Sequence, residues 1–152
     1  LRMDQEIKTC FAIGPVSAAS AESLGKTISS WRFESTRSYK VGDTTFSWTK
    51  HVVGADGRLH FTEGTSGQVL FIAIPVERKT SFDPCALLCL DPGKSAKAYF
   101  NGKVVWEYSD DAPLCNSPLS ATDALILLQV PASIPGGLKI MLNAPLDSLK
   151  LS

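Results

Sequence analysis

The sequence predicts an all-β fold, a sandwich or a barrel, in one domain that spans residues 1–152. Short runs rich in β-branched and aromatic residues recur along the chain, and turn signals built from Gly, Pro, Asn and Asp separate them at regular intervals. No long helical pattern is repeated. We expect eight or nine strands, at most one short helix near the N-terminus, and a loose segment over residues 1–9.

The first half of the chain contains one helical pattern among several strand patterns. Residues 11–15 (Phe-Ala-Ile-Gly-Pro) predict an entering strand that a Gly-Pro break closes. Residues 16–28, rich in Ala and Ser, are compatible with a short helix, although Gly25 and the lack of a clear cap weaken that pattern. The strands expected next are 31–33, 44–48, 50–53 and 58–61.

Two apolar runs in the second half, residues 68–76 and 85–90, are short enough to be strands buried on both faces. Pro75 is expected at the end of its strand or at a bulge, because proline donates no hydrogen bond to a β-ladder. Residues 109–120 are polar and contain proline, which predicts a loop. Further strands are expected over residues 125–130, 138–142 and 146–151.

The strongest local signal is a hairpin around Asn101-Gly102, the dipeptide that most readily adopts the positive φ angles of a type I′ turn. This turn predicts that Phe100 opposes Lys103 and that the remaining pairs follow in regular register. The expected pairs are Tyr99–Val104, Ala98–Val105 and Lys97–Trp106. Alternation then places Ala96, Ala98, Phe100 and Val105 on a core face, and Lys97, Tyr99, Val104, Trp106 and Tyr108 on the other face.

Composition and charge exclude several classes of partner. Lys plus Arg and Asp plus Glu both number 15, so no basic field favours nucleic acid or an anionic membrane. No apolar run reaches 18 residues, and residues 1–9 are too polar for a signal peptide. We expect no nucleic-acid partner and no membrane span, and we expect the chain to be a monomer.

The four cysteines, Cys10, Cys85, Cys89 and Cys115, allow two disulfides in any of three connectivities. Buried free thiols are the expected state for most of them, with a disulfide between sheets as the alternative. The C-x3-C spacing of Cys85 and Cys89 has no matching second pair of ligands, so it does not predict a zinc site.

Residues suited to catalysis are few. His51 and His60 belong to no nucleophile-elbow or zinc-ligand pattern, and we expect each to be hydrogen-bonded or solvated. Asp110 and Asp111 are adjacent, so on an extended chain they point apart, unlike the two carboxylates of a glycosidase. The sequence therefore indicates a protein that is not itself an enzyme, although it is compatible with one domain of a larger enzyme.

Residues suited to binding lie on the outer face of the hairpin. Tyr99, Trp106 and Tyr108 would offer flat rings for the apolar face of a sugar, with Lys97 beside them and Asn101 at the turn able to bond hydroxyls. The alternative is that this face packs under another strand, a loop or a neighbouring domain, since Trp is largely buried in most folds. Trp31 and Trp48 are expected to pack in the core or at an edge.

Three segments in this order resemble a known family. Residues 11–15 resemble the opening of some bacterial accessory domains of carbohydrate-active enzymes. Residues 98–105 (Ala-Tyr-Phe-Asn-Gly-Lys-Val-Val) are similar to the hairpin of galactose-binding-like jelly rolls, and residues 124–130 with 136–142 look like that family's closing strands. The resemblance covers residues 10–145.

The resemblance implies an antiparallel β-sandwich of the jelly-roll type, a carbohydrate-binding module of a larger secreted, periplasmic or cell-surface glycan-processing protein. The alternative it implies is a structural domain that docks on a catalytic domain and binds no sugar. Related domains often carry an acidic pair before the hairpin, and residues 91–95 (Asp-Pro-Gly-Lys-Ser) lack it. A structural calcium ion remains compatible with the resemblance; no other cofactor is expected.

Overall fold

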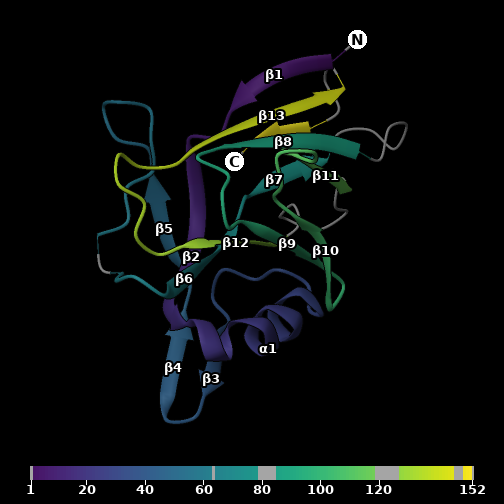
Figure 1. The fold of residues 1–152 in the computed structure, drawn as a ribbon. Helices are drawn as coiled ribbons and strands as arrows, with labels where there is room; N and C mark the ends of the chain where they lie inside the picture. Colours follow the sequence, from purple (N-terminus) through teal and green to yellow (C-terminus); the bar gives the residue numbers. More distant parts are fainter. Residues whose placement is uncertain (1, 63, 79–84, 119–126, 146–148, 152) are drawn as a thin grey trace.

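The computed structural model describes residues 2–62, 64–78, 85–118, 127–145 and 149–151 (Figure 1). They form one helix, α1 (Ala18–Ser29), and a set of short strands. The strands are β1 (Arg2–Glu6), β2 (Thr9–Ser17), β3 (Ser38–Val41), β4 (Thr44–Ser47), β5 (Thr49–Val52), β6 (Gln68–Ala73), β7 (Val76–Arg78), β8 (Cys85–Asp91), β9 (Lys97–Phe100), β10 (Lys103–Glu107), β11 (Leu114–Pro118), β12 (Leu127–Pro131), β13 (Lys139–Pro145) and β14 (Leu149–Leu151). Among the described residues, no helix has the length and apolar character needed to cross a membrane.

Two antiparallel sheets face each other and confirm the predicted sandwich. The four-stranded sheet has the order β1-β13-β8-β11, and the six-stranded sheet has the order β10-β9-β12-β6-β2-β5. Figure 1 shows α1 under the six-stranded sheet, on the side away from the four-stranded sheet. The described part of the molecule therefore has three layers, and only the six-stranded sheet is covered on both faces.

The strand order is that of a jelly roll. Eight of the strands pair like a long hairpin that has been rolled up: β1 with β13, β6 with β12, β8 with β11, and β9 with β10. The outermost pair joins the first and last of these strands, and the innermost pair is the hairpin around Asn101 and Gly102. The strand number exceeds the eight or nine expected because β2–β5 are inserted between β1 and β6, and because β7 and β14 form a small extra sheet.

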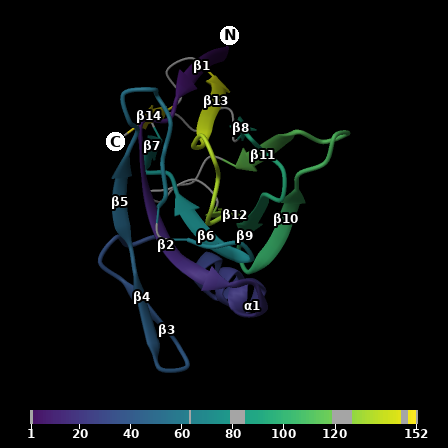
Figure 2. The ribbon, with the colours of Figure 1, turned by 60° about the vertical axis from the view of Figure 1, so that its left-hand side comes forward.

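The inserted segment builds the third layer. Strands β2 and β5 extend the six-stranded sheet beyond β6, α1 packs beneath it, and the β3–β4 hairpin projects beyond the sandwich in Figure 2. Gly25 lets the helix approach closely, because a methyl group at that position would lie 2.6 Å from Cζ of Tyr99. The glycine that weakens the helical pattern in the sequence is thus the residue that the packing requires.

The core has two parts, one on each side of the six-stranded sheet. Leu70 and Ile72 of β6 face the four-stranded sheet, and Phe71 and Ala73 face the helix. The prediction that residues 68–76 are buried on both faces is therefore confirmed, and Pro75 lies between β6 and β7, after the strand as expected.

The second apolar run, residues 85–90, behaves differently. In β8 only Ala86, Leu88 and Leu90 are buried, whereas Leu87 is half-buried and Cys89 is exposed, so the prediction of burial on both faces is wrong there.

Several other boundaries differ from the prediction. Contrary to the expected loose segment, Arg2–Glu6 forms β1, which pairs with β13 and is fastened by a hydrogen bond of 2.6 Å from Arg2 Nε to Asn143 Oδ1. Strand β2 continues past the Gly14-Pro15 bond through a shift of register. Residues 114–118, part of a predicted loop, form β11. Residues 31–33 form no strand, and residues 58–61 contribute only a bridge at Leu59.

The remaining strand predictions agree with the structure where it describes them. The 44–48, 50–53 and 138–142 patterns correspond to β4, β5 and β13. The 125–130 and 146–151 patterns overlap β12 and β14, and their residues 125, 126 and 146–148 lie outside the described residues. Cys10 and Cys115 are buried free thiols, Cys89 is an exposed free thiol and Cys85 is half-buried, so burial holds for only part of the set.

Candidate functional site

The hairpin adopts the predicted turn but not the predicted register throughout. Asn101 and Gly102 have φ angles of 52° and 81°, as a type I′ turn requires. The pairs next to the turn are as predicted, but a bulge at Val105 then places Trp106, not Val105, opposite Ala98. The extra residue moves Trp106 to the opposite face of the sheet from Tyr99.

Tyr99 is fully buried between the six-stranded sheet and α1, and is not on an outer face. Its ring packs edge-on against Phe71, with centroids 5.9 Å apart, and its hydroxyl donates a hydrogen bond of 2.8 Å to Oε1 of Gln129. Burial raises the pKa of this hydroxyl. The prediction that the three aromatic rings share one face is therefore wrong. The bulge turns Trp106 to the other face of the sheet, and α1 covers Tyr99.

Trp106 and Tyr108 remain together, half-buried at the open edge of the sandwich. They pack edge to face with centroids 6.3 Å apart, against the core between the two sheets. The indole Nε1 of Trp106 donates a hydrogen bond of 3.1 Å to the carbonyl oxygen of Ala112, and the ring of Tyr108 lies over Gly93. Both rings are thus already packed against other parts of the chain, so a bound sugar could contact only the surface that these contacts leave open.

The other two predicted binding residues lie elsewhere. Lys97 Nζ lies 3.6 Å from Oε1 of Glu107, the residue opposite it in the hairpin. Asn101 is exposed at the hairpin tip, where the next residue, Gly102, donates its N–H to the hydroxyl of Ser29 at the end of α1. The core assignment of Phe100 and Val105 is also wrong, since their exposed fractions are 42% and 49%. The structure does not gather the predicted residues into one site.

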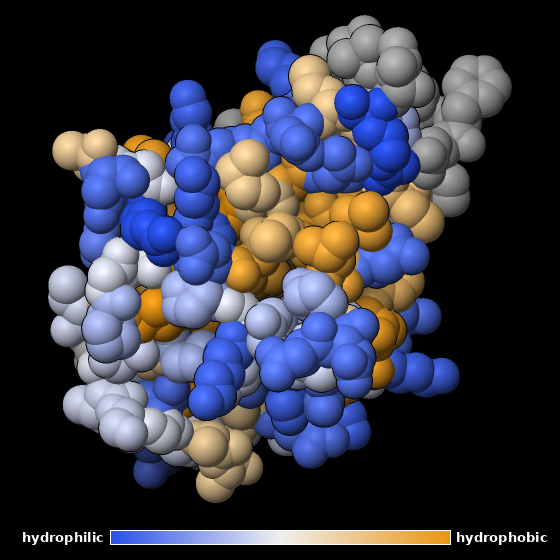
Figure 3. Space-filling model, turned by 45° about the horizontal axis from the view of Figure 1, so that its top comes forward, coloured by the Kyte–Doolittle hydropathy of each residue, from blue (hydrophilic) through white to orange (hydrophobic). Residues whose placement is uncertain are grey.

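The clearest uncovered feature is the outer face of the four-stranded sheet. The register places Leu114 of β11 opposite Cys89 of β8, and Cys89 opposite Met141 of β13. Leu87 lies two residues before Cys89 on β8, so it points to the same side of the sheet. Leu114 is 45% exposed, Cys89 is exposed, and the other two are half-buried. We call these four residues the apolar outer face. Figure 3, in which the top of the molecule comes forward, shows hydrophobic colouring gathered in the middle with hydrophilic side chains around it.

A polar ladder borders the apolar outer face on the side of β1. Asn143 accepts from Arg2 through its Oδ1 and backbone oxygen atoms, and its Nδ2 donates a hydrogen bond of 2.6 Å to Oδ1 of Asp4. An apolar centre with a polar rim is the usual anatomy of a protein interface.

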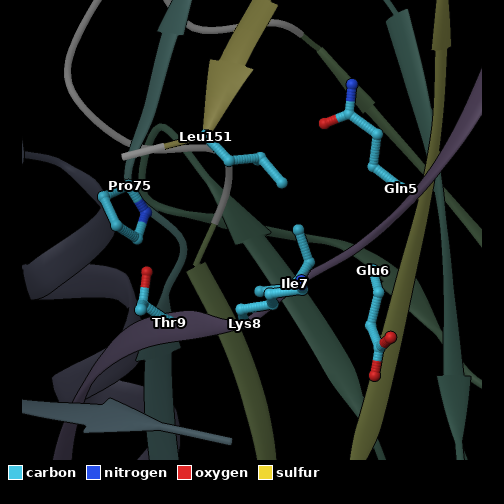
Figure 4. A pocket seen from close by; sticks show the side chains of 7 residues that line it. All are labelled: Gln5, Glu6, Ile7, Lys8, Thr9, Pro75 and Leu151. Carbon is cyan, nitrogen blue, oxygen red and sulfur yellow. The ribbon is translucent and has the colours of Figure 1, made fainter. Parts of the chain in front are cut away.

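Hollows also lie on other parts of the surface. A pocket of about 420 Å³ sits where the chain passes from β1 to β2, and Figure 4 shows Ile7 and Leu151 directed toward each other across it while the carboxylate of Glu6 points away. An open groove of about 650 Å³ has Phe11 and Phe33 among its lining, with ring centroids 5.6 Å apart.

Trp31, which is not among the predicted binding residues, is more exposed than Phe100 at the hairpin. Trp31, expected to pack in the core or at an edge, is 60% exposed after the end of α1, and the guanidinium of Arg37 lies 5.1 Å from its ring centroid. Trp48, by contrast, is buried beside Phe33 and Tyr39, as predicted. The sequence around Trp31 carries no signal of this exposure, because the pattern of residues 31–33 predicts a strand.

Groups for catalysis or metal binding are sparse. His60 Nε2 lies 2.7 Å from Oδ2 of Asp56, which confirms a hydrogen-bonded histidine; this contact, and then the N–H of Arg58, lowers the pKa of Asp56. Among the described residues, no three His, Cys, Asp or Glu side chains are grouped so that they could hold a metal ion.

Comparisons with known proteins found no match to a family model, to a curated protein or to a solved structure. The galactose-binding-like resemblance therefore stays a prediction. The function of the chain must be argued from its surface.

Proposed function

We propose that the chain is a non-catalytic docking domain that packs the apolar outer face of its four-stranded sheet against another protein domain. The observation that supports this proposal is the row formed by Leu114, Cys89 and Met141 on three adjacent strands, in which the first two are exposed and Met141 is half-buried. Contiguous exposed apolar surface costs free energy in water and is typical of protein interaction sites. The polar ladder beside it would form the rim of the interface.

The docking function predicts that the chain associates through this face when its partner is absent. Sedimentation velocity over a series of concentrations should show weak self-association, and alkylation of Cys89 should slow as the concentration rises. Leu114→Lys should abolish both effects, because association would have to desolvate a charge at the β11 end of the row. Val52→Lys is the matched control, since Val52 is 62% exposed on β5, away from this face.

Two results would overturn the docking function. One is a chain that stays monomeric at the highest concentration reached, with Cys89 alkylated at a constant rate. The other is self-association that Val52→Lys weakens as much as Leu114→Lys. A well-defined dimer would identify the partner domain as a second copy of this chain.

The second candidate function is carbohydrate binding by a secreted or cell-surface protein, now supported by Trp31 instead of the hairpin. More than half of this indole is accessible, and a flat ring offers a large apolar contact to one face of a sugar. A glycan array should show retention by the wild-type chain and loss in Trp31→Ala, with an unchanged melting temperature. If no glycan is retained, or if Trp31→Ala retains it equally well, this use of Trp31 is wrong.

A further inference from the structure

A small pocket on the edge of the six-stranded sheet carries both histidines of the chain. Its volume is about 190 Å³, and it lies between β2, β5, residues 60–62 and Gly64. The side chains that line it include His51, His60, Phe61, Thr49 and Thr62. The two histidines come from different segments, so their meeting in one pocket was not visible in the sequence.

The aromatic wall of the pocket is formed by His51 and Phe61. His51 pairs with the buried Cys10 in the sheet register, and its ring packs edge-on against that of Phe61, with centroids 4.9 Å apart. Across the pocket, Nε2 of His60 is held 2.7 Å from the carboxylate of Asp56. This contact fixes the orientation of the His60 ring.

The loop that brings His60 and Phe61 to the pocket is held at two neighbouring residues. Leu59 exchanges two backbone hydrogen bonds of 2.8 Å with Leu138. The guanidinium of Arg58 donates to the carboxylate of Asp91 at 2.9 Å and to the backbone oxygens of Asp91 and Gly137. Binding to a wall held in this way costs less ordering free energy than binding to an unanchored loop.

The size and the polar groups of the pocket favour a small neutral ligand. Of the charged groups described near it, Arg58 is paired with Asp91 and the carboxylate of Asp56 is held by His60, so each already has a partner within the chain. A volume of about 190 Å³ corresponds to about six water molecules at roughly 30 Å³ each. Imidazole and hydroxyl groups both donate and accept hydrogen bonds, as a ligand with several hydroxyls requires.

We propose that this pocket binds one small uncharged polyhydroxyl ligand, of the size of a single sugar ring or a cyclic polyol. The apolar face of the ligand lies against His51 and Phe61, and its hydroxyls bond the imidazoles and Thr49 or Thr62. The inference rests on the carbohydrate-binding candidate, to which it gives a site separate from Trp31, and it is independent of the docking function.

The test is a titration of the ¹⁵N-labelled chain with galactose, glucose, mannose and inositol, monitored by amide chemical shifts. The expected shifts centre on residues 49–51 and 60–62. His51→Gln should weaken binding about tenfold, the equivalent of one hydrogen bond and its ring contact. Lys50→Gln, an exposed neighbour on the same strand, and Trp31→Ala should leave the affinity unchanged.

Three results would overturn the proposal: no shifts with any of the four probes, shifts that centre elsewhere, or unchanged affinity in a folded His51→Gln chain. Tighter binding of acetate, phosphate or ethanolamine than of the four probes would refute the neutral ligand. The result is separable from the other functions. If the four probes cause no shifts while the wild-type chain still retains a glycan through Trp31, only the pocket proposal is refuted. The docking function is tested separately, by sedimentation velocity.

Discussion

Gly25→Ala tests the close approach of α1 to the six-stranded sheet. At an ordinary helix position this substitution stabilises by about 1 kcal/mol, because glycine is a poor helix former. Here the new methyl group would lie 2.6 Å from Cζ of Tyr99 and 2.9 Å from Cε1 of Phe71. Both rings are fully buried, and the hydroxyl of Tyr99 is held by Gln129, so neither ring can move aside easily.

Overpacking of a core costs typically about 1–3 kcal/mol, and the fixed rings place this site near the upper end. After subtraction of the helix gain, we expect the free energy of unfolding to fall by about 2 kcal/mol. For a chain of this length the melting temperature should fall by about 4–8 °C.

Urea unfolding followed by circular dichroism gives the free energy directly. Ser23→Ala is the matched control, since Ser23 is exposed on the same helix and alanine there should stabilise by a few tenths of a kcal/mol. Equal stabilisation by both variants would refute the packing of α1 described above.

Three further predictions concern buried groups. Tyr99→Phe should lower the free energy of unfolding by about 1–3 kcal/mol in urea titrations, because the buried oxygen of Gln129 loses the hydrogen bond that Tyr99 donates; an unchanged midpoint would contradict this. Trp106→Ala should lower the melting temperature, since the packing of the indole against the core and its hydrogen bond to Ala112 are lost, whereas truncation of an exposed binding residue would leave the melting temperature unchanged. Native-state alkylation at pH 8 should modify the exposed Cys89 and spare Cys10, because burial raises the pKa of the Cys10 thiol to about 12. The same thiol ionises near pH 9.0 in the unfolded chain. Cys10 should therefore make the free energy of unfolding fall as the pH rises above 9.0.

The sequence predicted the architecture well where local chemistry decides it. The Asn101-Gly102 dipeptide determined the turn and the first two pairs of the hairpin, because only the turn geometry matters there. It could not reveal the bulge at Val105. A bulge depends on whether Trp106 packs better against the core between the sheets, and that core is built by strands far away in the sequence.

The missed strand has a similar explanation. Residues 114–118 contain Asn116, Ser117 and Pro118, which are poor strand formers, so the local pattern favoured a loop. They form β11 because β8 offers a free edge with which every one of them pairs. Tertiary pairing here overrides local propensity.

Strands β6 and β8 carry the central argument about function. Both were predicted to be buried on both faces, because both are continuous apolar runs of similar length. For β6 the expectation holds, since the inserted α1 covers the outer side of its sheet. For β8 the expectation fails, since Leu87 is only half-buried and Cys89 is exposed on the outer side of its sheet.

A strand that is apolar on both sides belongs, in most folds, to a sheet with two covered faces. The six-stranded sheet receives its second cover from the segment between β1 and β6, whereas none of the described helices and strands forms a layer over the outer face of the four-stranded sheet. The row of Leu114, Cys89 and Met141 continues to Glu6 of β1, so a charged side chain lies at one end of this row and the apolar side chains fill the rest of it. In the docking function proposed above, another protein domain covers this face, and the Leu114→Lys experiment measures whether the face associates.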